Sequence, residues 1–261
     1  MEIGRRPIRI VEQHVQNPES HIAHRNSQIH MKRSDIVFVI VFAGLFIPFF
    51  LSRRLYDFFV WFSTDWAFTA SFIKFAILAT MGEMLGSRIR TGIYLPAGFA
   101  LLYRAVVWGF LGMTVKAAFM IFGGGTPLIL EHLGMENASA VMAGPVTGAR
   151  VLLAFAISTF LNIFYAPVLM VTHRVSDLHV AAAAGDRRKL LTVPDVKGLL
   201  ASIDWNSMWG IVLKKSIPLF WIPAQTVNFL LPEEFRMLVA ALYSTVLGVI
   251  LALAAGAGKR I

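Results

Sequence analysis

Long apolar runs, separated by short basic segments, are the feature that most constrains the fold of this chain. Several runs approach the roughly 20 apolar residues that a helix needs to cross a bilayer. Only 15% of the residues are charged and 57% are hydrophobic, whereas a soluble domain has about 25% charged residues. Backbone amides inside lipid must be hydrogen-bonded within the protein. The sequence therefore predicts an all-α, polytopic transmembrane helix bundle.

The predicted membrane domain covers residues 35–258 and follows a polar, basic tail at 1–34. Its six apolar runs are 36–51 with a continuation at 55–62, 66–86, 93–122, 143–172, 216–231 and 235–257. The first run, bent at Pro48, can cross alone or lie partly at the interface. We expect six crossings, and the alternative is four, with the first run and the segment at Trp221 not fully spanning. Gly123-Gly124-Gly125 is expected to end the third run. The spacing of apolar positions at 195–213 predicts an amphipathic helix on the membrane surface.

Basic residues predict the orientation of these runs, because cytoplasmic loops are enriched in Lys and Arg. With six crossings and a cytoplasmic N-terminus, the basic residues near 32–33, 88–90, 174–189 and 259–260 all fall inside. The glutamates at 131, 136, 233 and 234 fall outside. We expect both termini on the cytoplasmic side of a bacterial cytoplasmic membrane or of an organelle membrane. The net charge of +9 then reflects topology, so the expected partner is the lipid bilayer and not nucleic acid.

The stretch 221–236 interrupts apolar sequence with prolines and amides. Helix breaks are predicted at Pro223 and Pro232, and another at Pro167 in the fourth run. Gln225 and Asn228, three residues apart, share one face of a helix. Because polar groups in lipid need partners inside the protein, this face should point toward other helices or a wet cavity.

The same stretch carries a resemblance to a known family. Trp221, Pro223, Gln225, Asn228, Phe229, Pro232 and Arg236 follow one another in the order found at the start of the last helix in that family. The family groups the mitochondrial inner-membrane protein Mpv-seventeen with the peroxisomal membrane protein of twenty-two kilodaltons.

Weaker similarities to the family are Gly82-Glu83, where it has glycine-aspartate, and the aromatic-alanine-proline segment ending at Pro167. The chain departs from the family in lacking one residue between Asn228 and Pro232. The resemblance covers residues 67–258 and implies a small helical organelle membrane protein acting as a pore or in solute balance.

Charged side chains inside the apolar runs are the candidate functional residues, since each costs on the order of 2.5–3.5 kcal/mol at the bilayer centre. Glu83 is expected to pair with Arg104, Lys116 or Arg150. Our hypothesis is a polar cavity lined by Glu83, Asn162, Gln225 and Asn228, with Arg236 holding loop carbonyls or pairing with Glu233. The alternatives are that the cations extend to the surface, that Glu83 lies near Arg88 and Arg90, and that Gln225 and Asn228 only lock helices together.

The sequence contains no recognisable enzyme motif. There is no nucleophile elbow and no phosphate-binding loop, and the chain has no cysteine. His173 and Asp177, four apart, could ligate a metal, but we interpret them as solvated helix-end residues and expect no metal or cofactor. The predicted function is a channel-like or solute-permeation role for small anionic or neutral solutes. The alternative is a non-conducting structural or assembly protein, and oligomerisation is left open.

Overall fold

A computed structural model of the protein describes residues 32–257, which are mostly helical and contain no strand. The predicted tail at 1–34 therefore lies almost entirely outside the described residues, as do Lys259 and Arg260. The chain divides into two units, Met1–Leu55 and Tyr56–Ile261, and each is described by itself.

The first unit contains two short helices and the start of a third. Helix α2, Arg33–Gly44, begins where the Asp35 carboxylate accepts a hydrogen bond from the Lys32 amide (2.8 Å). The helix is interrupted at residues 45–46. Helix α3, Ile47–Leu51, follows and carries Pro48 in its first turn, where the missing N–H of proline has no cost. Helix α4, Arg53–Asp65, follows. The predicted bend at Pro48 is thus a break between two helices.

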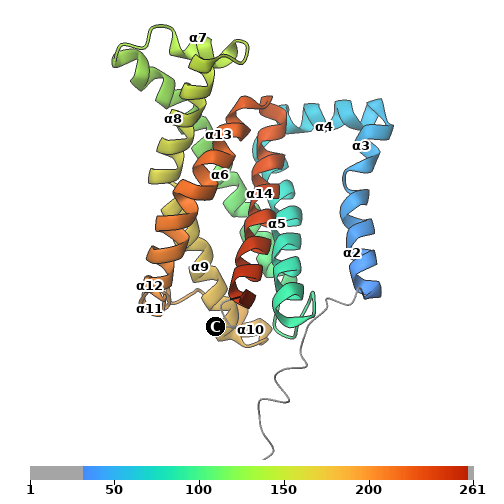
Figure 1. The fold of residues 1–261 in the computed structure, drawn as a ribbon. Helices are drawn as coiled ribbons and strands as arrows, with labels where there is room; N and C mark the ends of the chain where they lie inside the picture. Colours follow the sequence, from blue (N-terminus) through green and yellow to red (C-terminus); the bar gives the residue numbers. More distant parts are fainter. Residues whose placement is uncertain (1–31, 258–261) are drawn as a thin grey trace, which may run out of the picture. The chain divides into compact units, whose positions relative to one another are not determined.

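The second unit is built from long helices (Figure 1). Helix α5, Ala67–Thr91, packs against α6, Leu101–His132, and against α14, Glu233–Ala257. Helix α8, Gly148–Phe164, packs against α6 and against α13, Ile222–Leu230, and α9, Ala166–Ala183, continues from it. Phe75, Leu153, Ile157 and Phe229 are among the fully buried side chains that join these helices.

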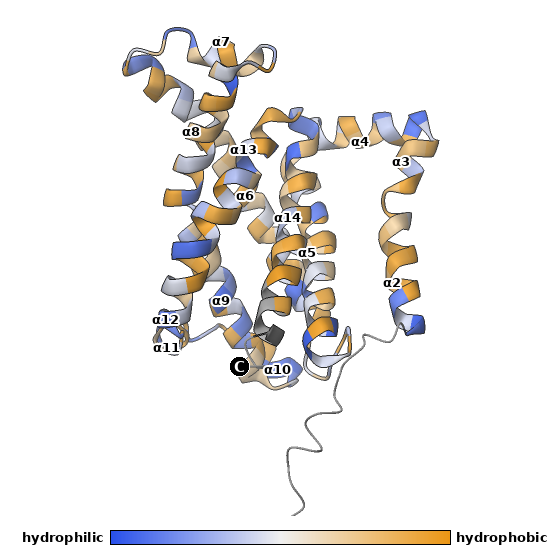
Figure 2. Cartoon of the chain, viewed as in Figure 1, coloured by the Kyte–Doolittle hydropathy of each residue, from blue (hydrophilic) through white to orange (hydrophobic). Residues whose placement is uncertain are grey.

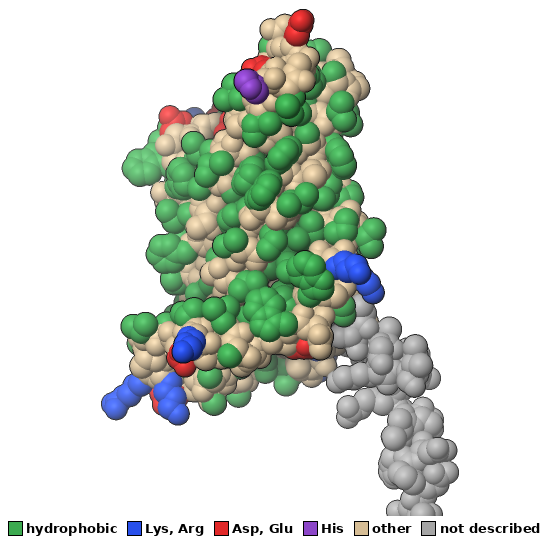
Figure 3. Space-filling model, turned by 90° about the vertical axis from the view of Figure 1, so that its left-hand side faces the viewer, with side chains coloured by type: hydrophobic (Ala, Val, Ile, Leu, Met, Phe, Trp, Pro, Cys, Tyr) green, Lys and Arg blue, Asp and Glu red, His purple; other side chains and the backbone are tan. Residues whose placement is uncertain are grey.

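Two helices among the described residues, α5 and α6, are long and apolar enough to cross a membrane. The pair α8 and α9 adds a third candidate if it is one span bent by 43°. Only 44% and 39% of the apolar windows in α5 and α6 are buried, so much apolar surface faces outward. Figure 2 shows hydrophobic residues along the long helices, and on the face in Figure 3 hydrophobic side chains cover the middle. The described residues thus contain two or three candidate spans, and six crossings remain a prediction.

Glycines allow α5 to approach its neighbours closely. A Cβ added at Gly82 would lie 2.8 Å from Thr245 Cα on α14, and one at Gly112 would lie 2.6 Å from Phe75 Cβ and 2.7 Å from the Ser71 carbonyl on α5. Thr245 Oγ1 also donates to the Leu78 carbonyl (2.9 Å). Gly82 and Gly86, one turn apart on α5, both lie where α5 meets α14.

Gly112→Ala should destabilise the protein by about 1–3 kcal/mol, because the new methyl group must displace the backbone of α5. Gly125→Ala, in the same helix, is the control, since nothing lies within 4 Å of its added Cβ. It should be neutral or stabilising by up to about 1 kcal/mol. Denaturant titration of both variants in detergent measures the difference, and equal stabilities would contradict the close packing.

The sequence prediction for the end of the third run is wrong. Gly123-Gly124-Gly125 does not end the third run, because α6 continues to His132. Glycine lowers helix propensity by only about 1 kcal/mol per residue, and the hydrogen bonds of a continuous helix outweigh that cost where little water is available.

The predicted amphipathic helix at 195–213 is three pieces: α11, Val196–Ala201, α12, Trp205–Ser207, and the start of the π-helix η1, Met208–Trp221. Asp195 caps the first piece, since its carboxylate accepts a hydrogen bond from the Gly198 amide. Asp204 interrupts the predicted helix, because its carboxylate accepts from the Ser207 amide and caps a new helix. The Ser207 hydroxyl and amide also lower the pKa of Asp204. The remaining short helices are α7, Ala138–Ala143, and α10, Arg187–Leu190.

Candidate functional site

Glu83 lies at the centre of a charged cluster between α5, α6 and α9. Its Oε2 accepts a hydrogen bond from Arg104 Nη1 (2.6 Å), and its Oε1 lies 2.7 Å from both Trp108 Nε1 and His173 Nε2. The same Arg104 nitrogen donates to Asp177 Oδ1 (2.5 Å). Of the three cations that we considered for Glu83, the structure brings only Arg104 to it.

Local structure fixes the members of this Glu83 cluster. Arg104 is in the first turn of α6, and its Nε donates to the Phe99 carbonyl just before the helix (2.8 Å). His173 and Asp177 are one turn apart on α9, and the rings of His173 and Trp108 are 4.3 Å apart between centroids. The Glu83 and Arg104 side chains are only 16% and 17% exposed. The cluster therefore holds two carboxylates and one permanent cation in a partly dry place.

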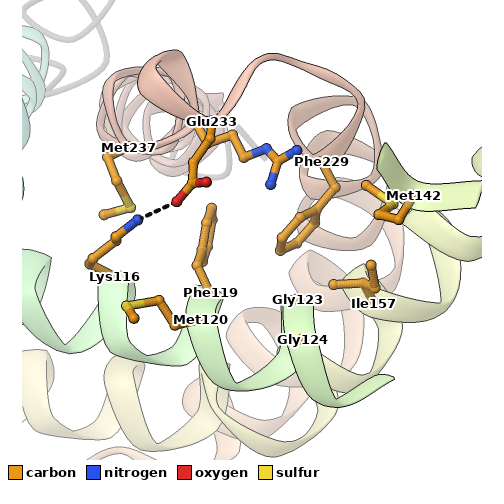
Figure 4. Close-up of a pocket in the computed structure, with 11 residues that line it drawn as sticks. Lys116, Phe119, Met120, Gly123, Gly124, Met142, Ile157, Phe229, Glu233 and Met237 are labelled. Atoms are coloured by element: carbon orange, nitrogen blue, oxygen red, sulfur yellow. Dashed lines mark hydrogen bonds and ion pairs between the residues drawn. The ribbon is translucent and has the colours of Figure 1, made fainter. Parts of the chain in front are cut away.

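Lys116 belongs to a second polar site. It lies 12 residues after Arg104 on α6, which corresponds to about 18 Å of helix. Its ammonium group donates to Glu233 Oε1 at the start of α14 (2.8 Å), as Figure 4 shows. The pair borders a cavity of about 330 Å³ whose other lining residues are Phe119, Met120, Gly123, Gly124, Met142, Ile157, Phe229, Arg236 and Met237. The charged groups of this Lys116 cavity are two cations and one carboxylate.

Arg150 and Arg236 hold carbonyls near this cavity. Arg150 Nη1 donates to the Gly144 carbonyl and its Nη2 to the Leu230 carbonyl (3.2 Å). Arg236 Nε donates to the Leu231 carbonyl (2.9 Å), which precedes Pro232. Arg236 thus adopts the first of its two predicted roles, and both arginines stabilise the chain between α13 and α14.

Gln225, Asn228 and Asn162 are buried in helix contacts. Asn228, 0% exposed, donates to Gln225 Oε1 (2.8 Å) and to the Arg236 carbonyl (3.0 Å). Asn162 donates to the carbonyl of Ser158 one turn earlier, and the Ser158 hydroxyl donates to Ile222 on α13 (2.8 Å). None of the three lines the Lys116 cavity. The structure does not bring these three residues to Glu83. The prediction of a single cavity lined by Glu83 and all three amides is therefore wrong for this conformation.

The three predicted prolines mark real breaks. Pro167 is in the first turn of α9 after the bend from α8, and Pro223 is in the first turn of α13 after η1. Pro232 immediately precedes α14. Each sits where a new helix begins, the position that tolerates a residue without an N–H.

An apolar layer separates the two polar sites along α6. Leu111 and Val115 are 6% and 5% exposed, and Phe75 of α5 packs against the same helix at Gly112. On the far side of this layer Phe119 stacks near Phe229, with 4.9 Å between ring centroids. The two sites are therefore separate in this conformation.

Sequence reasoning missed that His173, Asp177 and Trp108 belong to the Glu83 cluster. His173 and Asp177 are about one-quarter exposed and form ion pairs, so they are not solvated helix-end residues. Hydropathy placed the end of the fourth run at 172, but α9 continues to Ala183. Their spacing of four, which puts both on one face, was the available signal.

Comparison of the chain with models of known protein families finds no match, and searches of curated proteins and of solved structures find no similar chain.

Proposed function

We propose that this chain is an integral membrane protein with a channel-like or solute-permeation role. In the proposed topology the six apolar runs each cross the membrane, and both termini lie on the positively charged, cytoplasmic side of a bacterial or organelle membrane. The apolar outer faces of α5 and α6 support burial in lipid. The resemblance of residues 221–236 to the family of Mpv-seventeen and the peroxisomal protein supports the same class of function.

The observation that carries the proposal is the pair of polar sites along α6. The Glu83 cluster is near the first turn of α6, toward the end of the bundle where α5 ends at Arg88 and Arg90. The Lys116 cavity lies about three turns further on. Ionised groups at such depths are expensive, and in membrane proteins they commonly mark solute pathways. We infer that the apolar layer at Leu111 and Val115 is a closed constriction between the two ends of one path.

Charge in the cavity favours anionic or neutral solutes. Lys116 is 8% exposed and pairs with Glu233, while Arg236, three residues further along α14, also borders the cavity. One carboxylate cannot balance two cations, so one positive charge is in excess. Arg150, close enough to Arg236 to repel it electrostatically, adds to the positive potential. Anions should therefore be enriched in the cavity over cations.

The alternative function, a non-conducting structural or assembly protein, is favoured by a different observation. The close approach of α5 to α6 and α14 at Gly82 and Gly112, with the buried layer at Phe75 and Val115, is dense packing. A protein of this kind needs no opening of that layer, and its polar groups would only hold helices together.

Lys116→Met tests the role of the cavity. We expect purified protein in planar bilayers to pass anions more readily than cations, and this variant to lower the anion-to-cation permeability ratio several-fold, because it removes the excess positive charge. Its effect on stability should be small, since the Glu233 side chain is 67% exposed and can be hydrated. Reversal potentials in a salt gradient give the ratio.

The control is Lys197→Met, which removes a cation from the exposed surface of α11. It should leave the permeability ratio unchanged. An unchanged ratio in Lys116→Met would remove the cavity from the conducting path.

A further inference from the structure

Three side chains of the kinds that ligate metals converge in the Glu83 cluster. One ligand atom from each of Glu83, His173 and Asp177 lies within 4.8 Å of the others. His173 and Asp177 come from one face of α9 and Glu83 from α5, so helices already packed in the bundle set the geometry. An imidazole and two carboxylates from rigid helices are a chemically suitable ligand set for a transition metal.

Arg104 organises the two carboxylates without using all their oxygens. Its Nη1 holds Glu83 Oε2 and Asp177 Oδ1, while the other oxygen of each carboxylate is directed toward His173. Glu83 Oε1 is 2.7 Å from His173 Nε2, and Asp177 Oδ2 is 3.7 Å from His173 Nδ1. Metal-ligating carboxylates are commonly oriented by hydrogen bonds of this kind to their non-ligating atoms. Glu83 Oε1, which also accepts a hydrogen bond from Trp108 Nε1, forms the candidate ligand set together with Asp177 Oδ2 and one ring nitrogen of His173.

Charge also calls for a further cation at this place. Two carboxylates and one guanidinium leave one negative charge when His173 is neutral, and Trp108 contributes only a neutral donor. An unbalanced charge in a partly dry site is unfavourable. A divalent ion bound by His173, Glu83 and Asp177 would change this sum from −1 to +1, and a hydroxide bound to the ion at its fourth position would bring it to zero.

We propose that Glu83, His173 and Asp177 bind one divalent transition-metal ion of the zinc type. Zinc accepts nitrogen and carboxylate oxygen ligands, and three protein ligands leave a fourth position for water or a substrate. Magnesium and calcium prefer all-oxygen sites, so the imidazole selects against them. The site is about one-quarter exposed at His173 and Asp177, which leaves a way in for the ion. This proposal does not depend on whether the protein conducts.

Zinc binding to the full-length protein in detergent tests the proposal. After chelator treatment, equilibrium dialysis against zinc with elemental analysis should show one more ion per chain in the wild type than in His173→Gln. His132→Gln, which removes an exposed histidine of α6, is the matched control and should keep the ion. The histidines at 14, 21, 24 and 30 are the same in all variants. Asp177→Asn provides the same comparison if His173→Gln does not fold, and should weaken binding by more than about 100-fold.

Trp108 gives an independent readout, because its ring lies 4.3 Å from that of His173. Cobalt quenches nearby indole fluorescence, so titration with cobalt should reduce the tryptophan fluorescence of the wild type. The reduction should be smaller in Trp108→Phe and in His173→Gln. Equal zinc content in the wild type and both ligand variants would overturn the proposal. So would an absence of zinc binding at neutral pH, which would leave a proton on His173 as the compensating charge.

Discussion

Replacing Arg104 by methionine is expected to destabilise the protein by about 3–5 kcal/mol, the largest effect that we predict for one substitution. Arg104 Nη1 bonds both Glu83 and Asp177, and the Glu83 side chain is 16% exposed. Without the guanidinium, two carboxylates would face each other in a site with little water. The free energy of unfolding, from denaturant titration in detergent followed by circular dichroism, measures this loss.

Arg187→Met is the control for Arg104→Met, since Arg187 is exposed on the short helix α10. It should change stability by less than about 0.5 kcal/mol. Adding Glu83→Gln to Arg104→Met should recover part of the stability, because it removes one of the two unpaired charges. If Arg104→Met were as stable as Arg187→Met, the Glu83 cluster would not be a buried ionic site.

Asn228→Leu is expected to destabilise the protein by about 1–3 kcal/mol, which is comparable to the effect expected of Gly112→Ala. Asn228 is fully buried, and its amide joins Gln225 in α13 to the Arg236 carbonyl in α14. Leucine keeps the volume but removes both hydrogen bonds. Thermal or denaturant unfolding of the purified variant is the measurement.

Thr226→Val controls for a polar-to-apolar change in the same helix, because Thr226 Oγ1 bonds only within α13, to the Ile222 carbonyl (2.7 Å). It should cost less than about 0.5 kcal/mol. Since Asn228 does not line the Lys116 cavity, its variant should keep wild-type permeability per folded molecule. A loss of permeability with unchanged stability would instead assign Asn228 to the solute path.

Helical structure and most helix starts could be predicted from the sequence, because apolar runs and prolines act locally. Pro167, Pro223 and Pro232 mark the same boundaries in the sequence and in the structure. The aspartates at 195 and 204 could also have been interpreted as helix caps, since aspartate is favoured at that position. In the structure each carboxylate accepts a hydrogen bond from the backbone amide three residues later. The glycine run at 123–125 was misleading, because local propensity was overridden within a long helix.

The partners of the charged residues could be predicted only in part. Desolvation cost alone indicated that Glu83 needs a cation, but the choice between Arg104 and Lys116 depends on which turns of α5 and α6 lie side by side. That register is set by Gly109 and Gly112 against Phe72 and Phe75. Lys116 instead meets Glu233, more than a hundred residues away in the chain. Such pairs follow from tertiary packing, which spacing along one helix does not encode.

Conductance of the purified wild-type protein in planar bilayers tests the central proposal most directly. The proposal predicts discrete conductance steps with anions more permeant than cations, and a lower anion preference in Lys116→Met. Incorporation of folded protein must be verified in the same preparation, for example by protease protection of reconstituted vesicles. A bilayer that stays silent with folded protein present would contradict a permeation role and leave the polar sites as links that hold the helix bundle together.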